Sequence, residues 1–288
     1  MQILISLYPD FPVRLPFSYY HALSAGIYEI LNSLDENFAK DLHEGPLNAN
    51  RIKLLTISPL LSKIMEVHGG GRGSHLKEHN NNYFLLFKGN TYFRIATPIP
   101  NIAHACVAAF SNVDFLRVGS QVFRVKSVEI LSDPFFKENM TWISPGNSSI
   151  VTGWTIENAG KKVYQFPLDV VKDVPHCSEI IKHNLVHKLQ RLIEQTPEVC
   201  AAWMGNGHHS DTNLKDFVSE KDLSINIITD HDHFIYKTRL HQLKNNPVRS
   251  WRAPVMVKGP EWVQKIVWSC GLGQMNTMGF GLVEEVKL

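Results

Sequence analysis

Hydrophobic and polar positions in the first half of the chain predict strands and helices in a definite order. Residues 2–8 alternate between apolar and polar side chains, as a half-buried strand does. Apolar residues between Leu23 and Leu34 recur at helical spacing, and Ser18 is suited to cap that helix. The other elements expected here are a short helix after Asp35, a strand at 51–58, a hairpin of 83–87 with 91–95, a helix at 99–111 and a strand at 121–131. The order strand–helix–strand–strand–helix–strand is that of a ferredoxin-like fold.

The second half repeats this order with insertions. The elements expected are an extended segment at 140–156, a helix through 181–192 that stops before Pro197, a strand at 224–229, two extended pieces within 234–258, a helix at 260–270 and a closing strand at 280–286. The pattern therefore allows two ferredoxin-like domains in tandem, with a boundary near 133–140.

The last helix leads directly into a glycine-rich segment, GLGQMNTMGFG, at 271–281. Gly271 lies where a helix favours a glycine with a positive φ angle. Gly273, Gly279 and Gly281 follow, and glycines let backbone N–H groups come close to a ligand. A loop of exposed amides suits an anion such as a phosphate, although a tight connection between two elements also needs glycines. The segment is neither a dinucleotide fingerprint, which lies between a strand and the following helix, nor a P-loop, which needs Gly-Lys-Ser/Thr.

Composition narrows the class of protein. The chain has 288 residues, of which 44% are hydrophobic, enough for one large or two small domains. No apolar run reaches membrane-spanning length, and the first residues lack the basic start and long apolar stretch of a signal peptide. The four cysteines form no CxxC pair, which argues against a zinc ribbon or a disulfide scaffold and fits a reducing cytoplasm. The net charge is only +2, so a nucleic acid would have to be held by a local basic patch.

Such a patch is suggested in the second half. Basic residues there alternate with aromatic ones, and the combination can follow a phosphate backbone and stack bases, although a solvated sheet face would carry similar charges. The basic residues are Lys237, Arg239, Lys244, Arg249, Arg252 and Lys258, and the aromatic ones are Tyr236 and Trp251.

A metal site is the competing chemical interpretation. In His231-Asp232-His233, a strand conformation would place both histidines on one face, where they could bind a metal with a third ligand from elsewhere. Polar turn residues are the simpler interpretation of the same letters.

The form Gly-hydrophobic-Gly, five residues, Gly-hydrophobic-Gly at 271–281 resembles the C-terminal loop of the CRISPR-associated endoribonucleases that cut the repeat in precursor CRISPR RNA, members of the RAMP superfamily. The resemblance implies an α+β fold of two tandem ferredoxin-like (RRM-like) domains. Residues 1–135 would carry catalysis, and residues 136–288 would carry the RNA-binding loop. It implies CRISPR repeat RNA within precursor crRNA as the partner, with delivery of the product to a multi-subunit interference complex, and it leaves a homodimer open.

The resemblance also points to catalytic residues. The family has a tyrosine within the first long helix and a histidine just after it, and Tyr28 and His43 occupy these positions here. A lysine often follows as the third member. Lys53 is the candidate for that role, with Arg51 as its competitor. His21, seven residues before Tyr28 on the same helix face, is the rival base.

The chemistry of such a triad needs no metal and no cofactor. Histidine titrates near neutral pH and can act as acid or base, a tyrosine can orient the 2′-OH or help to deprotonate it, and a lysine can stabilise charge on the phosphate. The implied activity is a metal-independent endoribonuclease whose 2′-OH attack leaves a 2′,3′-cyclic phosphate and a 5′-OH. Gly271, Gly273, Gly279 and Gly281, with Lys237, Arg239, Arg249 and Arg252, would hold the RNA. The alternatives are a RAMP-type RNA-binding subunit without catalysis and a metal-dependent hydrolase that uses His231 and His233.

Overall fold

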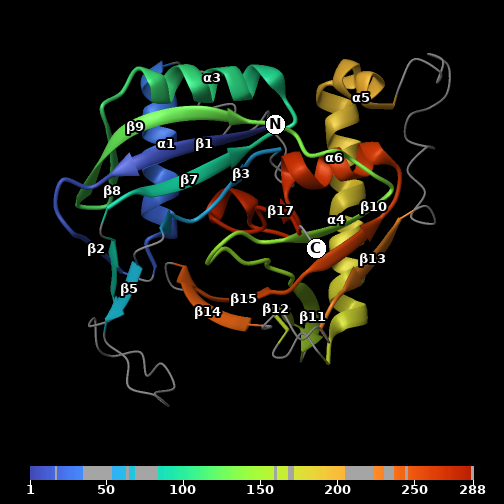
Figure 1. Cartoon of the computed structure of the whole chain (residues 1–288). Helices are drawn as coiled ribbons and strands as arrows, with labels where there is room; N and C mark the ends of the chain where they lie inside the picture. Colours follow the sequence, from blue (N-terminus) through green and yellow to red (C-terminus); the bar gives the residue numbers. More distant parts are fainter. Residues whose placement is uncertain are drawn as a thin grey trace.

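The computed structural model of the chain contains two antiparallel sheets, each packed against helices, that lie side by side (Figure 1). It describes residues 1–16, 18–34, 54–62, 65–68, 84–87, 89–158, 161–167, 172–204, 223–229, 237–243 and 246–286. Within these ranges, no helix combines the length and the apolar character that a membrane crossing needs.

The first sheet has the strand order β3-β7-β1-β9-β8, with β4 also paired to β7. Its strands are β1 (Gln2–Tyr8), β3 (Thr56–Ile57), β4 (Leu61–Ser62), β7 (Thr91–Ala96), β8 (Phe115–Val118) and β9 (Gln121–Leu131). Two helices pack against it, α1 (Tyr20–Leu34) and α3 (Pro100–Ser111). Ile3, Ile5 and Leu7 alternate along β1 and face these helices, which is why this strand is buried at the centre.

The second sheet has the order β13-β16-β10-β17. Its strands are β10 (Asn139–Ile143), β13 (Ser224–Ile227), β16 (Val255–Lys258) and β17 (Glu284–Glu285), and its helices are α4 (Val174–Gln195), α5 (Pro197–Met204) and α6 (Glu261–Cys270). Four strands of the first sheet, β1, β3, β7 and β9, correspond in chain order to β10, β13, β16 and β17 of the second. In both sets the first strand lies between the third and the fourth, and the second strand lies at an edge of the sheet. The repeat of element order in the sequence is thus a repeat of strand order in space.

Three smaller units complete the fold. A three-stranded sheet has the order β2-β6-β5, and two hairpins join β11 to β12 and β14 to β15. Their strands are β2 (Val13–Pro16), β5 (Met65–His68), β6 (Phe84–Phe87), β11 (Trp154–Asn158), β12 (Lys161–Gln165), β14 (Lys237–Leu243) and β15 (Asn246–Arg252).

The expected hairpin of 83–87 with 91–95 is wrong. Both segments are strands, but β6 pairs with β2 and β5, whereas β7 pairs with β1 on one edge and with β3 and β4 on the other. Because both edges of β7 are occupied, β6 is left to a different sheet. Gly89, with a φ of 85°, lies in the short connection where the chain changes sheets.

The other expected elements agree with the structure to different extents. The strands at 2–8 and 121–131 and the helices at 99–111, 181–192 and 260–270 are confirmed, with ends that differ by up to seven residues. The described part of the segment 234–258 holds three whole strands, β14, β15 and β16, where two were expected, and the closing strand is only two residues long. The strands β2 and β8 and the helix α5 were not anticipated. The helix expected after Asp35 lies outside the described residues.

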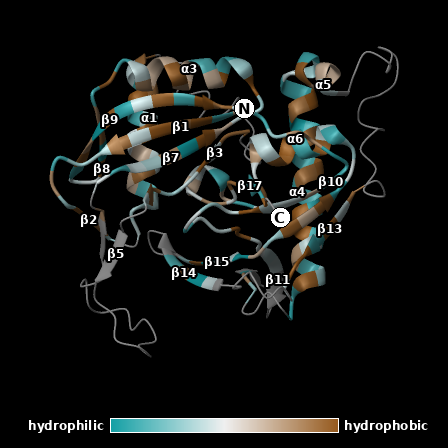
Figure 2. Ribbon diagram, in the orientation of Figure 1, coloured by the Kyte–Doolittle hydropathy of each residue, from teal (hydrophilic) through white to brown (hydrophobic). Residues whose placement is uncertain are grey.

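Two hydrophobic cores lie between the sheets and their helices, and Figure 2 shows hydrophobic residues along the strands and on the helices that cover them. Each core takes side chains from the other half, with Val248 and Phe280 in the first core and Leu54 in the second. The four cysteines are buried within these cores as free thiols.

Hydrogen bonds also join the two halves. The buried Gln2 side chain donates from Nε2 to the carbonyl oxygens of Trp268 (3.0 Å) and Val283 (2.9 Å). On the outer face of β7, Arg94 forms an ion pair with Glu284 of β17, at 3.1 Å. The start of the chain is therefore fixed to its last helix and strand.

Candidate nucleic-acid interface

The glycine-rich segment lies at the junction of the two halves. Gly271, Gly273, Gly279 and Gly281 all have positive φ angles, between 67° and 93°, as the sequence predicted. All four are buried, however, so the expectation of an exposed loop is wrong for the glycines themselves. A Cβ atom on Gly273 would lie 2.4 Å from the carbonyl oxygen of Val151, and one on Gly279 would lie 2.4 Å from the Tyr20 ring. The glycines are needed because backbone and ring atoms of other elements pack directly against them.

Backbone amides of this segment are largely satisfied within the protein. The amide of Leu272 donates to Gly281 O (2.8 Å), that of Gln274 to Val151 O (2.9 Å), and that of Gly281 to Ser149 O (2.8 Å). The Asn276 side chain, in the short 3-10 helix η3 (Asn276–Met278), donates to two carbonyl oxygens at either end of the segment, both at 3.2 Å. The turn is thus held in one shape by its own hydrogen bonds, and its half-buried part is 274–278 with the exception of Asn276.

A buried lysine braces the beginning of the segment. Lys188, on α4, is 1% exposed, and its ammonium donates to the carbonyl oxygens of Cys270 (3.0 Å), Gly271 (2.9 Å) and Gly273 (3.2 Å). Burial lowers the pKa of Lys188 to about 8, against a smaller opposing effect of Cys270. The sequence did carry a signal for this residue, because Lys188 falls on the apolar stripe of α4 together with Ile181 and Leu185.

Aromatic side chains connect the segment to α1. The Tyr20 ring stacks on Phe280 at 5.2 Å between centroids, and His241 of β14 meets both rings edge-on, at 5.1 and 5.0 Å. Burial, assisted by the charge of Arg239, lowers the pKa of His241 to about 4, so the imidazole is neutral at physiological pH. Ser24 of α1 donates to the carbonyl oxygen of Thr277 at 3.0 Å. The first helix and the glycine-rich segment therefore form one packed unit.

Two of the predicted basic residues lie beside this unit. On the hairpin β14–β15, Arg239 and Arg252 project to the same face as His241 and Ser250, as the strand register requires. Arg239 donates from Nη1 to Asn147 O (2.7 Å), and Arg252 donates from Nε to Ser144 O (2.9 Å). Burial and the positive charge of Arg239 lower the pKa of Arg252. Backbone carbonyls thus hold both guanidinium groups in place, and the two positive charges are close enough to affect each other.

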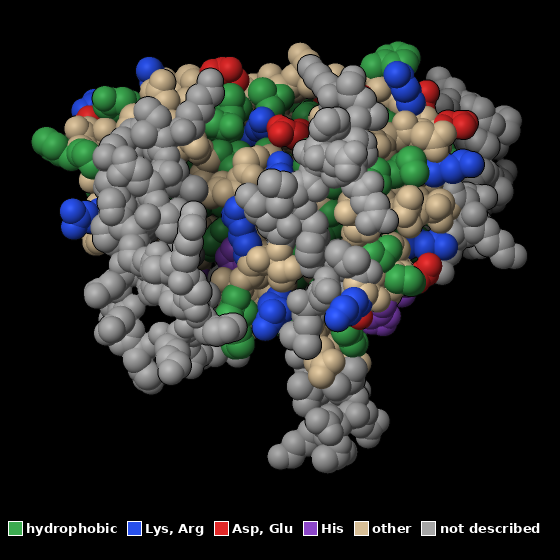
Figure 3. Space-filling model, turned by 60° about the horizontal axis from the view of Figure 1, so that its bottom comes forward, with side chains coloured by type: hydrophobic (Ala, Val, Ile, Leu, Met, Phe, Trp, Pro, Cys, Tyr) green, Lys and Arg blue, Asp and Glu red, His purple; other side chains and the backbone are tan. Residues whose placement is uncertain are grey.

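Of the other two basic candidates, Arg249 is not brought to this place. Arg249 pairs with Leu240 in the register and is half-buried on the opposite face of the hairpin. Lys237 lies in β14 opposite Arg252, and its side chain is outside the described residues. Figure 3 shows several separate Lys and Arg side chains down the middle of the viewed face and others scattered toward its edges.

Among the predicted catalytic residues, the structure describes Tyr28 and His21. Tyr28 is partly buried on α1, packed against the first core, and burial raises its pKa to about 12, with a smaller contribution from Cys106 of α3. His43, Lys53 and the competitor Arg51 lie outside the described residues, as do His231 and His233 of the metal alternative. In the described part of the chain, no three His, Cys, Asp or Glu side chains gather in a way that could hold a metal ion.

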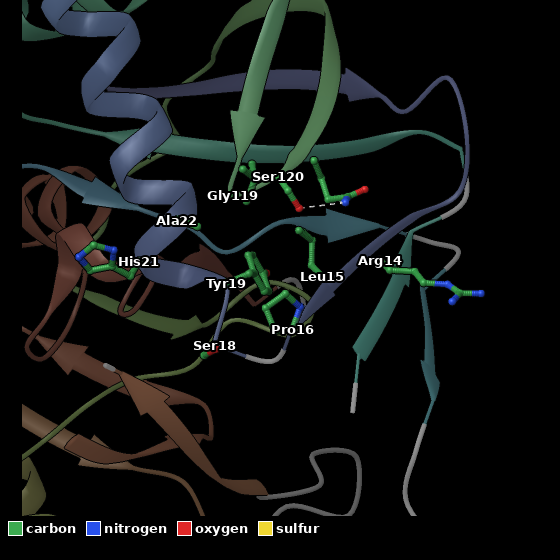
Figure 4. A pocket seen from close by; sticks show the side chains of 11 residues that line it. Arg14, Leu15, Pro16, Ser18, Tyr19, His21, Ala22, Gly119 and Ser120 are labelled. Carbon is green, nitrogen blue, oxygen red and sulfur yellow. Dashed lines mark hydrogen bonds between the residues drawn. The ribbon is translucent and has the colours of Figure 1, made fainter. Parts of the chain in front are cut away.

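An open cleft of about 420 Å³ lies beside His21. One wall is formed by Ser18 and Tyr19, just before α1, and by His21 in its first turn, and the other is the turn Gly119–Ser120 between β8 and β9 (Figure 4). Figure 4 also shows that Arg14 extends away from the other labelled residues. The cleft is large enough for a small ligand, and its lining includes polar side chains. Sequence periodicity could not predict it, because its walls come from elements that are distant along the chain.

Comparisons with known proteins agree with the resemblance found in the sequence. Residues 131–285 match the family model described as CRISPR associated protein Cas6, C-terminal. The chain is 24% identical over 289 residues to the CRISPR-associated endoribonuclease Cas6 1 of Methanocaldococcus jannaschii, a match that covers 100% of this chain and 93% of the relative. It is 23% identical to the CRISPR-associated endoribonuclease Cas6 of Pyrococcus furiosus, over 99% of this chain and 89% of the relative.

Solved structures show the same fold. A structure described as CRISPR associated protein Cas6 superposes with a TM-score of 0.68 at 21% identity and covers 100% of this chain and 99% of its own. A second, described as a RAMP protein binding different RNA substrates, gives a TM-score of 0.69 at 16% identity and covers 100% of both chains. The mixed α/β fold with antiparallel sheets is thus that of these proteins. Because the family model matches more than half of the chain, at residues 131–285, this protein belongs to the Cas6 family of CRISPR-associated proteins.

Proposed function

We propose that this protein is an endoribonuclease that cleaves CRISPR repeat RNA to produce mature crRNA. Membership of the Cas6 family supports the proposal, as do two curated relatives that match along nearly the whole chain and are named for this activity. The structural observation that carries it is the packing of the glycine-rich segment on α1. That contact joins a family-specific loop to the helix that carries Tyr28 and leads to His43.

The proposed mechanism is 2′-OH attack on the adjacent phosphate without a metal. His43 would transfer the proton as acid or base, and Lys53 would stabilise the negative charge that builds on the phosphate. The pKa of Tyr28, raised by burial to about 12, keeps its phenol protonated at neutral pH. Tyr28 is therefore better suited to orient the 2′-OH by a hydrogen bond than to deprotonate it. The products would be a 2′,3′-cyclic phosphate and a 5′-OH.

RNA would be held beside the junction by Arg239 and Arg252. Each guanidinium spends one N–H on a backbone carbonyl, and a guanidinium has five N–H donors, so donors and positive charge remain for a phosphate. Because the four glycines are buried, a direct contact between the segment and RNA would involve its half-buried part around 274–278. The contribution of Arg249 and Lys237 stays a prediction.

We also infer that the two sheets belong to two tandem ferredoxin-like domains, with a boundary near 133–140. The strand order, with the first strand between the third and fourth in both sheets, supports this assignment. Assembly with a multi-subunit interference complex, and dimer formation, stay predictions.

The test is cleavage of the repeat RNA from the protein's own CRISPR locus in excess EDTA. We expect one cut that leaves a 2′,3′-cyclic phosphate, and no cut when the scissile nucleotide lacks its 2′-OH. Cleavage that stops in EDTA would favour the metal-dependent alternative. Binding without cleavage, with or without metal, would favour the RNA-binding subunit.

A further inference from the structure

Exposed aromatic and arginine side chains lie together on the outer face of the first sheet. The register of β1, β9 and β8 pairs Arg124 with Tyr8 on one side and with Phe115 on the other. Tyr8 is 42% exposed and Phe115 is 48% exposed. The Arg124 guanidinium lies 5.2 Å from the centroid of the Phe115 ring, within the range of a cation–π contact.

Further residues extend this row. Phe11, in the connection from β1 to β2, is 80% exposed, and its neighbour Asp10 forms an ion pair with Arg124 at 3.5 Å. Two residues along β8 on the same face, the exposed Arg117 pairs with Val122, which is 45% exposed. We call the residues Tyr8, Phe11, Phe115, Arg117, Val122 and Arg124 the β8–β9 surface.

The β8–β9 surface is separate from the junction. Its side chains alternate with Leu116, Val118 and Phe123, which are buried in the first core, so they point away from α1 and α3. It lies at the end of the first sheet that is farthest from the second sheet (Figure 1). Among the described residues, the hydrogen bonds and the ion pair given above that join the two halves do not involve it.

Large apolar side chains that cluster on an exposed surface commonly mark an interaction site. Here the ring faces alternate with guanidinium groups, and this is the combination that stacks unpaired nucleobases and binds the phosphates between them. We propose that the β8–β9 surface binds a single-stranded stretch of the substrate RNA, beyond the nucleotides held at the junction. The proposal rests on the proposed function, because it assumes an RNA substrate.

The charge of the β8–β9 surface favours RNA over a protein as its occupant. Arg117 and Arg124 within the β8–β9 surface and Lys126 next to it face the acidic side chains Asp10 and Asp114, and Glu129 lies farther along β9, so the surface carries a small local excess of positive charge that favours a polyanion. Contact between two copies through the same surface would bring the arginines of one copy against those of the other, which is unfavourable.

The surface also continues toward the open cleft. The turn Gly119–Ser120 that joins β8 to β9 lines the cleft beside His21. A strand of RNA that lies along the short hairpin would therefore pass from the aromatic row to this cleft.

The experiment compares the RNA affinities of the wild-type protein, two test variants and one control variant. The probe is the repeat RNA with a single-stranded extension, used alone and with the extension annealed to its complement. The test variants are Phe11→Ala/Phe115→Ala and Arg124→Ala. The matched control is Phe135→Ala, because Phe135 is equally exposed, at 80%, and also has a cation near its ring, Lys137 at 6.0 Å, but lies beyond the other end of β9.

We expect the double variant to raise the Kd for the single-stranded probe by about tenfold or more, because stacked bases lose their aromatic platforms. Arg124→Ala should raise the Kd less at high salt than at low salt. Phe135→Ala should bind like the wild type. Annealing the extension should abolish the difference between the double variant and the wild type.

Wild-type affinity in the folded double variant would overturn the proposal, as would an equal loss on the annealed probe. A change in oligomeric state in place of a change in affinity would assign the surface to contact between copies. A wild-type protein that binds the repeat but does not cut it would contradict the proposed function and leave this affinity test intact.

Discussion

Replacing Lys188 with Met tests whether a buried charge holds the junction together. In the variant, Thr56 still donates to the Cys270 oxygen, at 2.6 Å, whereas the Gly271 and Gly273 oxygens lose the ammonium. A buried acceptor left without its donor costs about 1–3 kcal/mol, so two of them cost roughly 2–6 kcal/mol. The ammonium itself is unfavourable to bury. Its pKa of about 8, compared with 10.5 for an ordinary lysine, corresponds to about 3 kcal/mol at neutral pH, since one pKa unit is about 1.4 kcal/mol.

The two effects oppose each other, and pH separates them. Between pH 8 and 10.5 the folded protein releases the Lys188 proton while the unfolded chain keeps it, so the free energy of unfolding of the wild type rises with pH. We therefore expect Lys188→Met to be only modestly less stable than the wild type at pH 7. The gap between the two proteins should widen by about 2 kcal/mol by about pH 9.5, when the burial of charge no longer opposes the hydrogen bonds.

Urea unfolding of both proteins at several pH values between 7 and 9.5 measures this gap. The matched control is Lys182→Met, on the same helix, because the Lys182 side chain is only partly buried. Its gap from the wild type should stay constant with pH. If the Lys188→Met gap is constant or narrows as pH rises, then the pKa of Lys188 is not lowered in the folded protein, and charge burial does not oppose these hydrogen bonds.

The remaining predictions concern catalysis, the turn and RNA affinity. His43→Ala should slow cleavage of saturating repeat RNA by about 10²–10⁴-fold and leave its Kd nearly unchanged, as single-turnover kinetics and filter binding would show. Tyr28→Phe should slow cleavage less than His43→Ala without moving the pH profile, because a phenol with a pKa of about 12 does not titrate in the working range; a shifted profile would argue for a base. Gly279→Val should destabilise the fold by at least about 2 kcal/mol in urea unfolding, because the new side chain meets the Tyr20 ring at a φ of 93°; wild-type stability would contradict the packing. Arg252→Ala should weaken RNA binding and reduce the slope of log Kd against log salt by about one, whereas an unchanged slope would remove Arg252 from the phosphate contacts.

Local patterns predicted the long elements well because their periodicity is a local property. The strand at 2–8 and the helix at 260–270 carry apolar residues at spacings that only one secondary structure can bury. Strand pairing was less predictable. The rule that neighbouring strands pair favoured β6 with β7, and it failed because β7 is enclosed by β1, β3 and β4, which come from other parts of the chain.

The candidate site was predictable only in part, for a similar reason. The glycine pattern indicated positive φ angles, which is a local requirement, but whether the turn is open depends on Tyr20 and Val151, which are distant in sequence. Lys188 stood on an apolar stripe, but nothing local showed that its partners would be backbone carbonyls more than eighty residues away. The aromatic contacts of His241 likewise depend on tertiary structure alone.

The hydrogen bonds of Gln2 have a consequence for the order in which the protein folds. Its side chain binds carbonyls of Trp268 and Val283, which are separated from it by 266 and 281 residues. During synthesis the first strand leaves the ribosome long before these partners exist. Until then the Gln2 side-chain amide can form hydrogen bonds only with water or in transient contacts. Contacts of such long range close slowly, and large domains with late-forming contacts are exposed to aggregation in the meantime. The contacts of the first strand are therefore completed only when residues from Trp268 onward are made, and a ribosome stalled just before Trp268 should hold a first half that is more sensitive to proteases than the finished fold.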